Sequence, residues 1–265
     1  MTIYNTAGKA RFLGSLALFT MLLNLAACEK SVSVTGPLAS KMEIQEWRAP
    51  DCKPEEDCTS VVVKREVFTE RPALNDAVLR QLIEQLQGNG EAPAAPGDTS
   101  LAQVAQAFID DAAEVSDISS ARWQLTGDAK KLAQRDNLLT MAVTSYIYSG
   151  GAHGMSVTRW LNWDLNEDHP VALADVIKPG AEAEFWARAR TAHGEWLDTQ
   201  SMDADFRQNW PFVHSDDFRL TEDGLVLLYG VYTLGPYSMG EIELTLPWTQ
   251  LADVVREHYL PEGGH

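Results

Sequence analysis

The chain has 265 residues, of which 45% are hydrophobic, and it carries a formal charge of −17 at pH 7. A chain of this length can bury one large core or two smaller ones. Its negative charge repels the phosphates of nucleic acids, which excludes nucleic acid as a partner and favours a basic protein. The alternative is that the charge serves only to keep the protein in solution.

The first 27 residues are typical of a secretory signal. Lys9 and Arg11 precede an apolar run, and that run ends in Leu25-Ala26-Ala27-Cys28. This ending resembles a bacterial lipobox, and the resemblance implies cleavage after residue 27 and acylation of Cys28, with palmitate among the acyl chains. The alternative is an uncleaved membrane anchor, but Phe12 to Leu25 is shorter than the ~20 apolar residues that a spanning helix needs.

The residue after the lipobox bears on the location of the protein. An Asp directly after the lipidated cysteine resembles the inner-membrane retention signal of enteric bacteria. This chain has Glu29 at that position instead. We therefore expect a lipoprotein of a Gram-negative cell envelope, anchored to the outer membrane and facing the periplasm. Residues 28–40 are interpreted as the lipidated cysteine and a tether, and the folded part is expected to start near Lys41.

Cys52 and Cys58 are the remaining two cysteines. In an oxidising compartment they are expected to form a disulfide that closes a small loop. A metal-binding pair is the alternative, but no nearby histidine or cysteine completes a site. We predict no metal and no cofactor. The loop joins two predicted strands at residues 42–47 and 59–68.

Two helices are predicted after these strands. Apolar side chains recur at helical spacing over residues 73–87, with Asn75 as the expected N-cap. Ser100 and Gln103 then match a capping box that opens a second helix, which is expected to run to about Ala113.

The second half of the chain alternates between strands and helices. Strands are predicted at residues 123–125, 138–148, 157–165, 218–220, 225–231 and 241–246. Helical segments are predicted at residues 173–177, 181–197 and 251–259. Strands mixed with segregated helices predict an α+β fold, in which a mostly antiparallel sheet packs with helices in one domain or in two closely packed lobes.

Six sequence runs in this half resemble a known family. In chain order they are Tyr146–Gly154, Leu161–Leu165, Leu173–Val176, Phe218–Leu225, Gly235–Gly240 and Leu246–Trp248. They resemble the DUF3298 and DUF4163 domains, which form the extracellular part of RsiV-type anti-sigma factors and accompany peptidoglycan deacetylases of the PdaC type. On this resemblance, residues 41–140 are DUF4163-like and residues 141–260 are DUF3298-like.

The resemblance implies a function in the cell envelope. RsiV-like domains bind lysozyme as sensors, whereas PdaC-type proteins carry catalysis in a separate domain that we expect this chain to lack. The leading hypothesis is therefore a non-catalytic lipoprotein that binds a cell-wall-related ligand such as peptidoglycan, or a basic muramidase such as lysozyme. The alternatives are an uncharacterised peptidoglycan hydrolase and a purely structural envelope lipoprotein.

Two loops supply the residues that we expect to bind a ligand. These residues are Ser149, Gly150, Gly151, His153, Pro236 and Tyr237. Glycine permits the close approach of a partner, serine and histidine offer polar contacts, and tyrosine can anchor an interface. If the two loops lie at one end of a sheet, they form one composite face. The alternatives are a turn that needs glycine only for its geometry, a buried histidine and an inward-packed tyrosine.

No catalytic motif is found in the sequence. The six histidines form neither an H-E-x-x-H motif nor a close pair, and no G-x-S-x-G motif occurs. Asp216 with Asp217, and Glu241 with Glu243, could act as the paired carboxylates of a glycosidase only if the fold brought them within the ~5 to 9.5 Å that such enzymes use. We instead interpret them as part of a solvated acidic face. We predict that the protein is not an enzyme.

Overall fold

The structure is a computed structural model that describes residues 38–50, 52–53, 56–88, 99–116 and 121–261. The predicted signal, Cys28 and most of the predicted tether lie outside the described residues. The described ranges all belong to one compact unit. Within them, no helix combines the length and the apolar character needed to cross a membrane.

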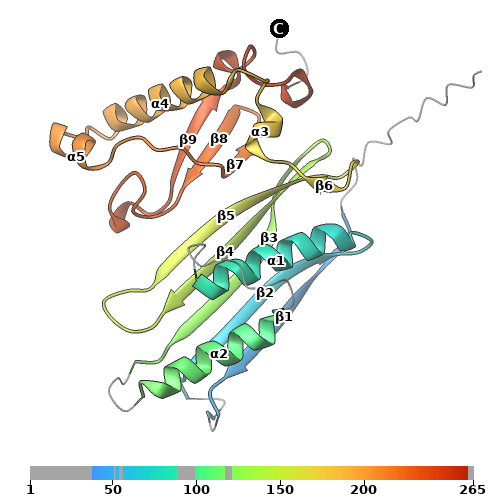
Figure 1. Cartoon of the computed structure of the whole chain (residues 1–265), viewed down its shortest axis with the longest axis vertical. Coiled ribbons are helices and arrows are strands. Elements are labelled where there is room, and N and C mark those ends of the chain that lie inside the picture. Colours follow the sequence, from blue (N-terminus) through green and yellow to red (C-terminus); the bar gives the residue numbers. More distant parts are fainter. Residues whose placement is uncertain (1–37, 51, 54–55, 89–98, 117–120, 262–265) are drawn as a thin grey trace, which may run out of the picture. The chain divides into compact units, whose positions relative to one another are not determined.

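Two β-sheets and five α-helices make up the fold in these described ranges (Figure 1). The six-stranded sheet contains β1 (Ser40–Arg48), β2 (Ser60–Phe68), β3 (Gln124–Arg135), β4 (Leu138–Tyr148), β5 (Met155–Asp164) and β6 (His169–Pro170). The three-stranded sheet contains β7 (Phe218–Leu220), β8 (Gly224–Tyr229) and β9 (Ile242–Pro247). The helices are α1 (Pro72–Gly88), α2 (Leu101–Glu114), α3 (Leu173–Val176), α4 (Glu182–Thr199) and α5 (Ala204–Asn209).

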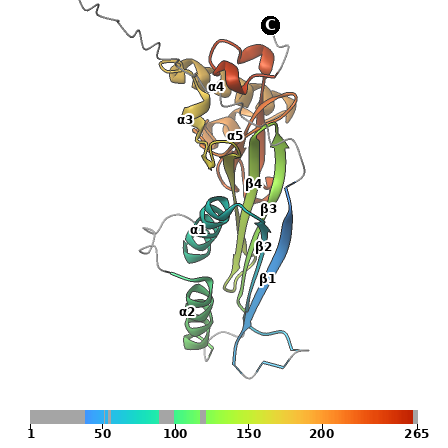
Figure 2. The same cartoon turned by 90° about the vertical axis from the view of Figure 1, so that its right-hand side faces the viewer.

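Strands that follow one another in the chain are neighbours in both sheets. All pairs are antiparallel except β2 and β3, which are parallel. A parallel pair needs a crossover connection, and the segment that contains α1 and α2 provides it. Both helices cover the same face of the six-stranded sheet, as the side view shows (Figure 2). The predicted α+β fold with a mostly antiparallel sheet is thus confirmed.

The helix-covered face of the six-stranded sheet holds one apolar core. Leu74, Val78 and Leu82 of α1 are almost fully buried against it. Gly127 of β3 allows this close packing, because a Cβ at that position would lie 2.9 Å from Leu82 Cδ1. A second core lies between α4 and the three-stranded sheet, with Phe185 at its centre.

The two sheets meet at β4 and β5. Ala142 and Trp160 pack against Val226 and Leu228 of β8 in a small apolar cluster. Beside it, the Asn162 side chain donates a 2.7 Å hydrogen bond to the carbonyl oxygen of Phe218. Because helices cover one face of β4 and the second sheet covers the other, that strand is apolar along most of its length.

Two local predictions are wrong, and one predicted strand is too short. Asn75 is not an N-cap, because α1 begins at Pro72 and the Asn75 side chain instead hydrogen-bonds both the N–H and the carbonyl of Phe68. The strand predicted at residues 123–125 extends to Arg135, since pairing with two neighbours outweighs its polar composition.

The predicted C-terminal helix at residues 251–259 is also absent. Val255 forms a β-bridge with Ile177, and Lys178 and Arg256 donate backbone hydrogen bonds across the same pairing. In place of one continuous helix, a hydrogen-bonded turn at residues 251–254 precedes this bridge, and short 3₁₀ turns form at Trp248–Gln250 and Glu257–Tyr259. The capping box of Ser100 and Gln103, by contrast, is confirmed at the start of α2.

Candidate functional site

The hairpin between β4 and β5 turns through the glycine-rich loop Ser149–Gly154. Gly150 and Gly151 have φ angles of +104° and +93°, a region that other residues rarely adopt. Gly154 is needed for a different reason, because a Cβ there would lie 2.4 Å from the ring of Tyr146. The glycines therefore allow a tight turn that packs closely on β4.

The second predicted loop, which holds Pro236 and Tyr237, meets this turn. The Tyr237 ring stacks on the His153 ring, with centroids 4.0 Å apart and an interplanar angle of 19°. The Tyr237 hydroxyl donates a 3.0 Å hydrogen bond to the carbonyl oxygen of Gly154. Ser149 and His153 are exposed, whereas Pro236 and Tyr237 are partly buried. The two loops thus lie together, and ligand binding by them stays a prediction.

Tyr232 extends this aromatic surface. Its ring centroid lies 5.7 Å from that of Tyr237, and 48% of the residue is exposed. Its φ angle of +62° is uncommon for a residue other than glycine. Such strained backbone is often found at functional positions. We call His153, Tyr232 and Tyr237 the aromatic ledge.

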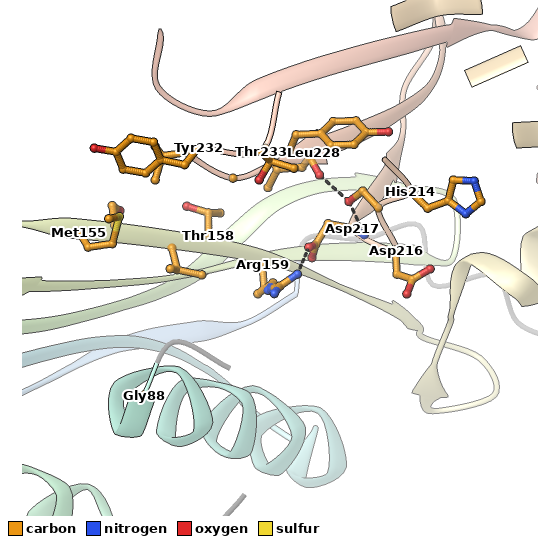
Figure 3. A pocket seen from close by; sticks show the side chains of 16 residues that line it. Gly88, Met155, Thr158, Arg159, His214, Asp216, Asp217, Leu228, Tyr232 and Thr233 are labelled. Carbon is orange, nitrogen blue, oxygen red and sulfur yellow. Dashed lines mark hydrogen bonds and ion pairs between the residues drawn. The ribbon is translucent and has the colours of Figure 1, made fainter. Parts of the chain in front are cut away.

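An open groove of about 660 Å³ continues from the ledge (Figure 3). One wall is the segment Met155–Arg159 of β5, and the other consists of His214–Asp217 and Leu228–Thr233. Gly88, at the end of α1, also lines it. Because Tyr232 belongs both to the ledge and to the groove, the two features form one continuous surface.

Asp217 is a buried member of the groove lining, and β5 engages both of its oxygens. Oδ2 accepts a 2.8 Å hydrogen bond from the Arg159 guanidinium, which Figure 3 shows as a dashed line. Oδ1 accepts a 2.9 Å hydrogen bond from the backbone N–H of Trp160. Hydrogen bonds of this charge-assisted kind are strong. The carboxylate therefore holds the segment before β7 against the edge of β5.

The other carboxylates considered as glycosidase pairs, Asp216, Glu241 and Glu243, lie at the surface. Glu243 forms an ion pair with Arg219 at 2.8 Å, and Asp216 is exposed. The His214 ring stacks on Trp186, with centroids 3.9 Å apart and planes only 6° from parallel. Among the described residues, no three His, Cys, Asp or Glu side chains gather as metal ligands would. The groove offers contact surface, exposed polar groups and the exposed carboxylate of Asp216.

Two polar groups near the second core are buried without partners. The Tyr229 hydroxyl and His193 Nε2 have no hydrogen-bond partner within the described ranges. Burial raises the pKa of Tyr229, so this phenol stays neutral. Burial also lowers the pKa of His193, and the charges of Arg190 and Arg207 lower it further.

The structure describes the predicted disulfide but not the predicted lipidation site. Cys52 and Cys58 form the predicted disulfide, with their Cα atoms 6.1 Å apart. Cys28 lies outside the described residues, so its lipidation stays a prediction.

Three features of the site were missed in the sequence: Tyr232 as an exposed aromatic, the pairing of Arg159 with Asp217, and the groove along β5. A usable signal existed for Tyr232, since Tyr232-Thr233 lies between a buried strand and the loop of Tyr237. The pairing had no sequence signal, because its partners are far apart in the chain.

The fold and the site define a class of protein: an α+β scaffold of two sheets with a surface groove where the sheets meet. The chain belongs to the DUF3298 family. It is 30% identical to a DUF3298 family protein of Pseudomonas aeruginosa with a known crystal structure, and the match covers 85% of this chain and 98% of that one, with a TM-score of 0.71. The family model described as a protein of unknown function, DUF3298, matches residues 174–249.

Two further similarities concern the fold and the first half of the chain. A DUF3298 family structure from Bacteroides fragilis is 18% identical over 83% of this chain and 95% of its own, with a TM-score of 0.60, and it supports the fold alone. The family model described as deacetylase PdaC matches residues 52–156.

A curated protein that is named PdaC is also similar to this chain. The peptidoglycan-N-acetylmuramic acid deacetylase PdaC of Bacillus subtilis is 22% identical over an alignment of 152 residues, and the match covers 54% of this chain. The chain spans 31% of the length of that relative.

Proposed function

We propose that this protein is a non-catalytic binding module of the bacterial cell envelope that captures a cell-wall-related ligand, with a basic muramidase such as lysozyme as the leading partner. The observation that carries this proposal is the aromatic ledge and its continuation into the groove. Exposed tyrosine side chains supply large contact area at low entropic cost, and they are enriched at protein interfaces.

The charge of the protein supports a basic partner. The chain has a formal charge of −17, and Asp216 presents an exposed carboxylate in the groove. Opposite charge accelerates the encounter of two proteins more than it strengthens their final complex. A cationic enzyme would therefore be captured quickly, and added salt would slow its association while leaving its dissociation almost unchanged.

The connection to the cell wall rests on similarity. The curated relative is named for its action on peptidoglycan, and the PdaC family model matches residues 52–156, which include β4 and the glycine-rich loop. Absence of catalysis in this chain is part of the proposal, and it agrees with the structural use of Asp217 and Glu243 in ion pairs.

We further propose that Cys28 carries the lipid that anchors the protein to the outer membrane, facing the periplasm. The lipobox ending at Cys28 supports this location. Cys28→Ala should abolish palmitate labelling and leave an unprocessed precursor, because the thioether requires the sulfur atom. Normal labelling and membrane fractionation of this variant would refute the lipid anchor.

The binding proposal is tested with lysozyme, with purified peptidoglycan and with an envelope extract, each applied to the immobilised chain from residue 29 onward. Tyr232→Ala should weaken the binding of the captured ligand roughly 30-fold, the effect of losing an interface anchor worth about 2 kcal/mol. Ile44→Ala is the matched control, since Ile44 is an exposed apolar residue of β1 and is 62% exposed. Equal binding by both variants, or no binding of any of the three probes, would refute the proposal.

Peptidoglycan hydrolysis is the competing function, because His214 and Asp216 line an open groove. The same preparations of peptidoglycan, incubated with the protein, report on it directly. Release of soluble fragments that is lost in Asp216→Asn would replace the binding proposal with an enzymatic one.

A further inference from the structure

Within the described residues, only part of the second edge of strand β5 is hydrogen-bonded. Its first edge pairs with β4 along the whole strand, from Met155 to Asp164. On the second edge, β6 pairs with the last two residues of β5. Val171 then donates a 2.9 Å backbone hydrogen bond to the carbonyl of Asn162, and Trp160 donates its N–H to the Asp217 carboxylate. The chain thus satisfies this edge from Asp164 back to Trp160.

Ser156 and Thr158 continue the same edge, and their outward backbone groups have no partner among the described residues. Alternate residues of an antiparallel strand direct both N–H and C=O toward the same edge. The register between β4 and β5 is unbroken, so the N–H groups of Ser156 and Thr158 point away from β4, as that of Trp160 does. Within the described part of the chain, no backbone group pairs with them on this side. Both residues line the groove.

The groove has the length of a short strand. Its wall of five β5 residues, Met155–Arg159, extends roughly 17 Å at ~3.4 Å per residue. Tyr232 and Thr233 lie across the groove from β5, and Asp216 lies toward its other end (Figure 3). An extended peptide presents N–H and C=O groups at the spacing that this edge needs, and a glycan chain does not.

We propose that the edge of β5 at Ser156 and Thr158 is a strand-addition site for an extended segment of a partner protein that carries a basic side chain. The incoming backbone pairs with the free N–H and C=O groups of both residues and extends the six-stranded sheet. Its basic side chain pairs with Asp216, and the charge of −17 on the whole chain favours such a segment. This inference goes beyond the proposed function, since it specifies a docking mode whatever the partner does.

A random linear peptide library displayed on phage provides the probe. The full chain is used for selection, and each selected peptide is synthesised and measured against two variants. Thr158→Pro removes the outward N–H and places a ring at the edge, which an unpaired edge position tolerates. Thr158→Val is the matched control, because both variants lose the 3.0 Å hydroxyl contact with Thr144 but only the valine keeps the N–H.

We expect selected peptides rich in Lys and Arg that bind Thr158→Pro roughly tenfold or more weakly than Thr158→Val, the effect of losing one or two hydrogen bonds. Hydrogen exchange gives a readout that needs no variant. The amides of Ser156 and Thr158 should exchange quickly in the free protein and slowly with peptide bound, whereas those of Val157 and Arg159 should be slow in both states, since they face β4.

Three outcomes would overturn the proposal. The first is a selection that enriches no peptide. The second is a set of peptides that bind both variants equally or leave the exchange of Ser156 and Thr158 unchanged. The third is protection of these two amides by soluble peptidoglycan fragments and by no peptide, which would assign the groove to a cell-wall polymer. Failure of lysozyme capture would not affect any of these readouts, so the two proposals fail separately.

Discussion

Two connections between neighbouring antiparallel strands of the six-stranded sheet are held by different means. Between β1 and β2, the disulfide of Cys52 and Cys58 closes the connection on itself. Between β4 and β5, the turn depends on glycine conformations and on a hydrogen bond from Tyr237, which belongs to a loop of the other sheet. The first connection is closed by its own disulfide and by a 3.0 Å hydrogen bond from Arg122, just before β3, to the carbonyl of Asp57, whereas the second is held in part by Tyr237 from a loop of the other sheet. A ligand bound at the second can therefore respond to the junction of the sheets.

The largest expected effect comes from breaking the second connection at its tightest contact. Gly154→Ala places a Cβ against the Tyr146 ring and should destabilise the protein by about 3 kcal/mol, the upper range for overpacking. Urea unfolding measures the loss. Gly194→Ala in α4 is the control, since its Cβ meets no atom within 4 Å and alanine favours a helix. A Gly154→Ala protein as stable as the wild type would show that the turn is not tightly packed.

The first connection should cost less to break. Replacing Cys52 and Cys58 by serine should lower the free energy of unfolding by about 2 kcal/mol, because the closed loop is short. Hydrogen exchange at Ser149–Gly154 should stay unchanged in this double variant. Faster exchange there would contradict the independence of the two connections.

A single hydrogen bond tests the dependence on the second sheet. Tyr237→Phe keeps the ring stacked on His153 but removes the hydroxyl that donates a hydrogen bond to the carbonyl of Gly154. The free energy of unfolding should therefore fall by about 1 kcal/mol. Exchange in the glycine-rich turn should accelerate. Tyr148→Phe removes a longer bond of 3.2 Å to Gly151 and should cost less. Equal effects of both variants would remove the special role assigned to Tyr237.

Acidification should destabilise the part of the fold that contains α4 and the three-stranded sheet, on which the second connection depends. Burial, and then the charges of Arg190 and Arg207, hold the pKa of His193 below its ordinary value of 6.5. The unfolded chain therefore binds a proton more readily, so stability is complete above about pH 6.5 and declines as the pH falls from there through the folded pKa. This effect should be the smallest of the four, because one imidazole acts only within that interval.

Urea unfolding at pH 7.5 and 5.0 measures the decline. His193→Gln should show a smaller decline than the wild type, because its side chain does not titrate. Equal declines in the two proteins would contradict the role of His193.

Sequence patterns predict elements well where local and tertiary preferences agree. The apolar run of β4, the glycines of Ser149–Gly154 and the pair of Ser100 and Gln103 each specify their structure locally. Strand β3 is the opposite case, since its polar second half becomes a strand only because it lies between β2 and β4. The end of the chain is likewise drawn out of a helix by its pairing with Ile177.

The candidate site divides in the same way. The loops of His153 and Tyr237 were predicted from their residue types, and the structure brings them together. The groove was not predictable, because its walls come from β5 and from two segments more than fifty residues later in the chain. Asp217 attracts attention in the sequence as half of an acidic pair, but its hydrogen bonds to Arg159 and Trp160 exist only in the fold.

The parallel pairing of β2 with β3 has a consequence for the order of folding. Strands β3 to β5 are joined by short turns and can pair locally, whereas β2 reaches β3 only after the long segment with α1 and α2 has been ordered. Closing such a segment costs chain entropy before its contacts form, which slows that step. We expect the β3–β5 meander to assemble early and the β1–β2 hairpin to dock late. A nascent chain in which β5 has just been synthesised would therefore still present β3 as an unpaired edge.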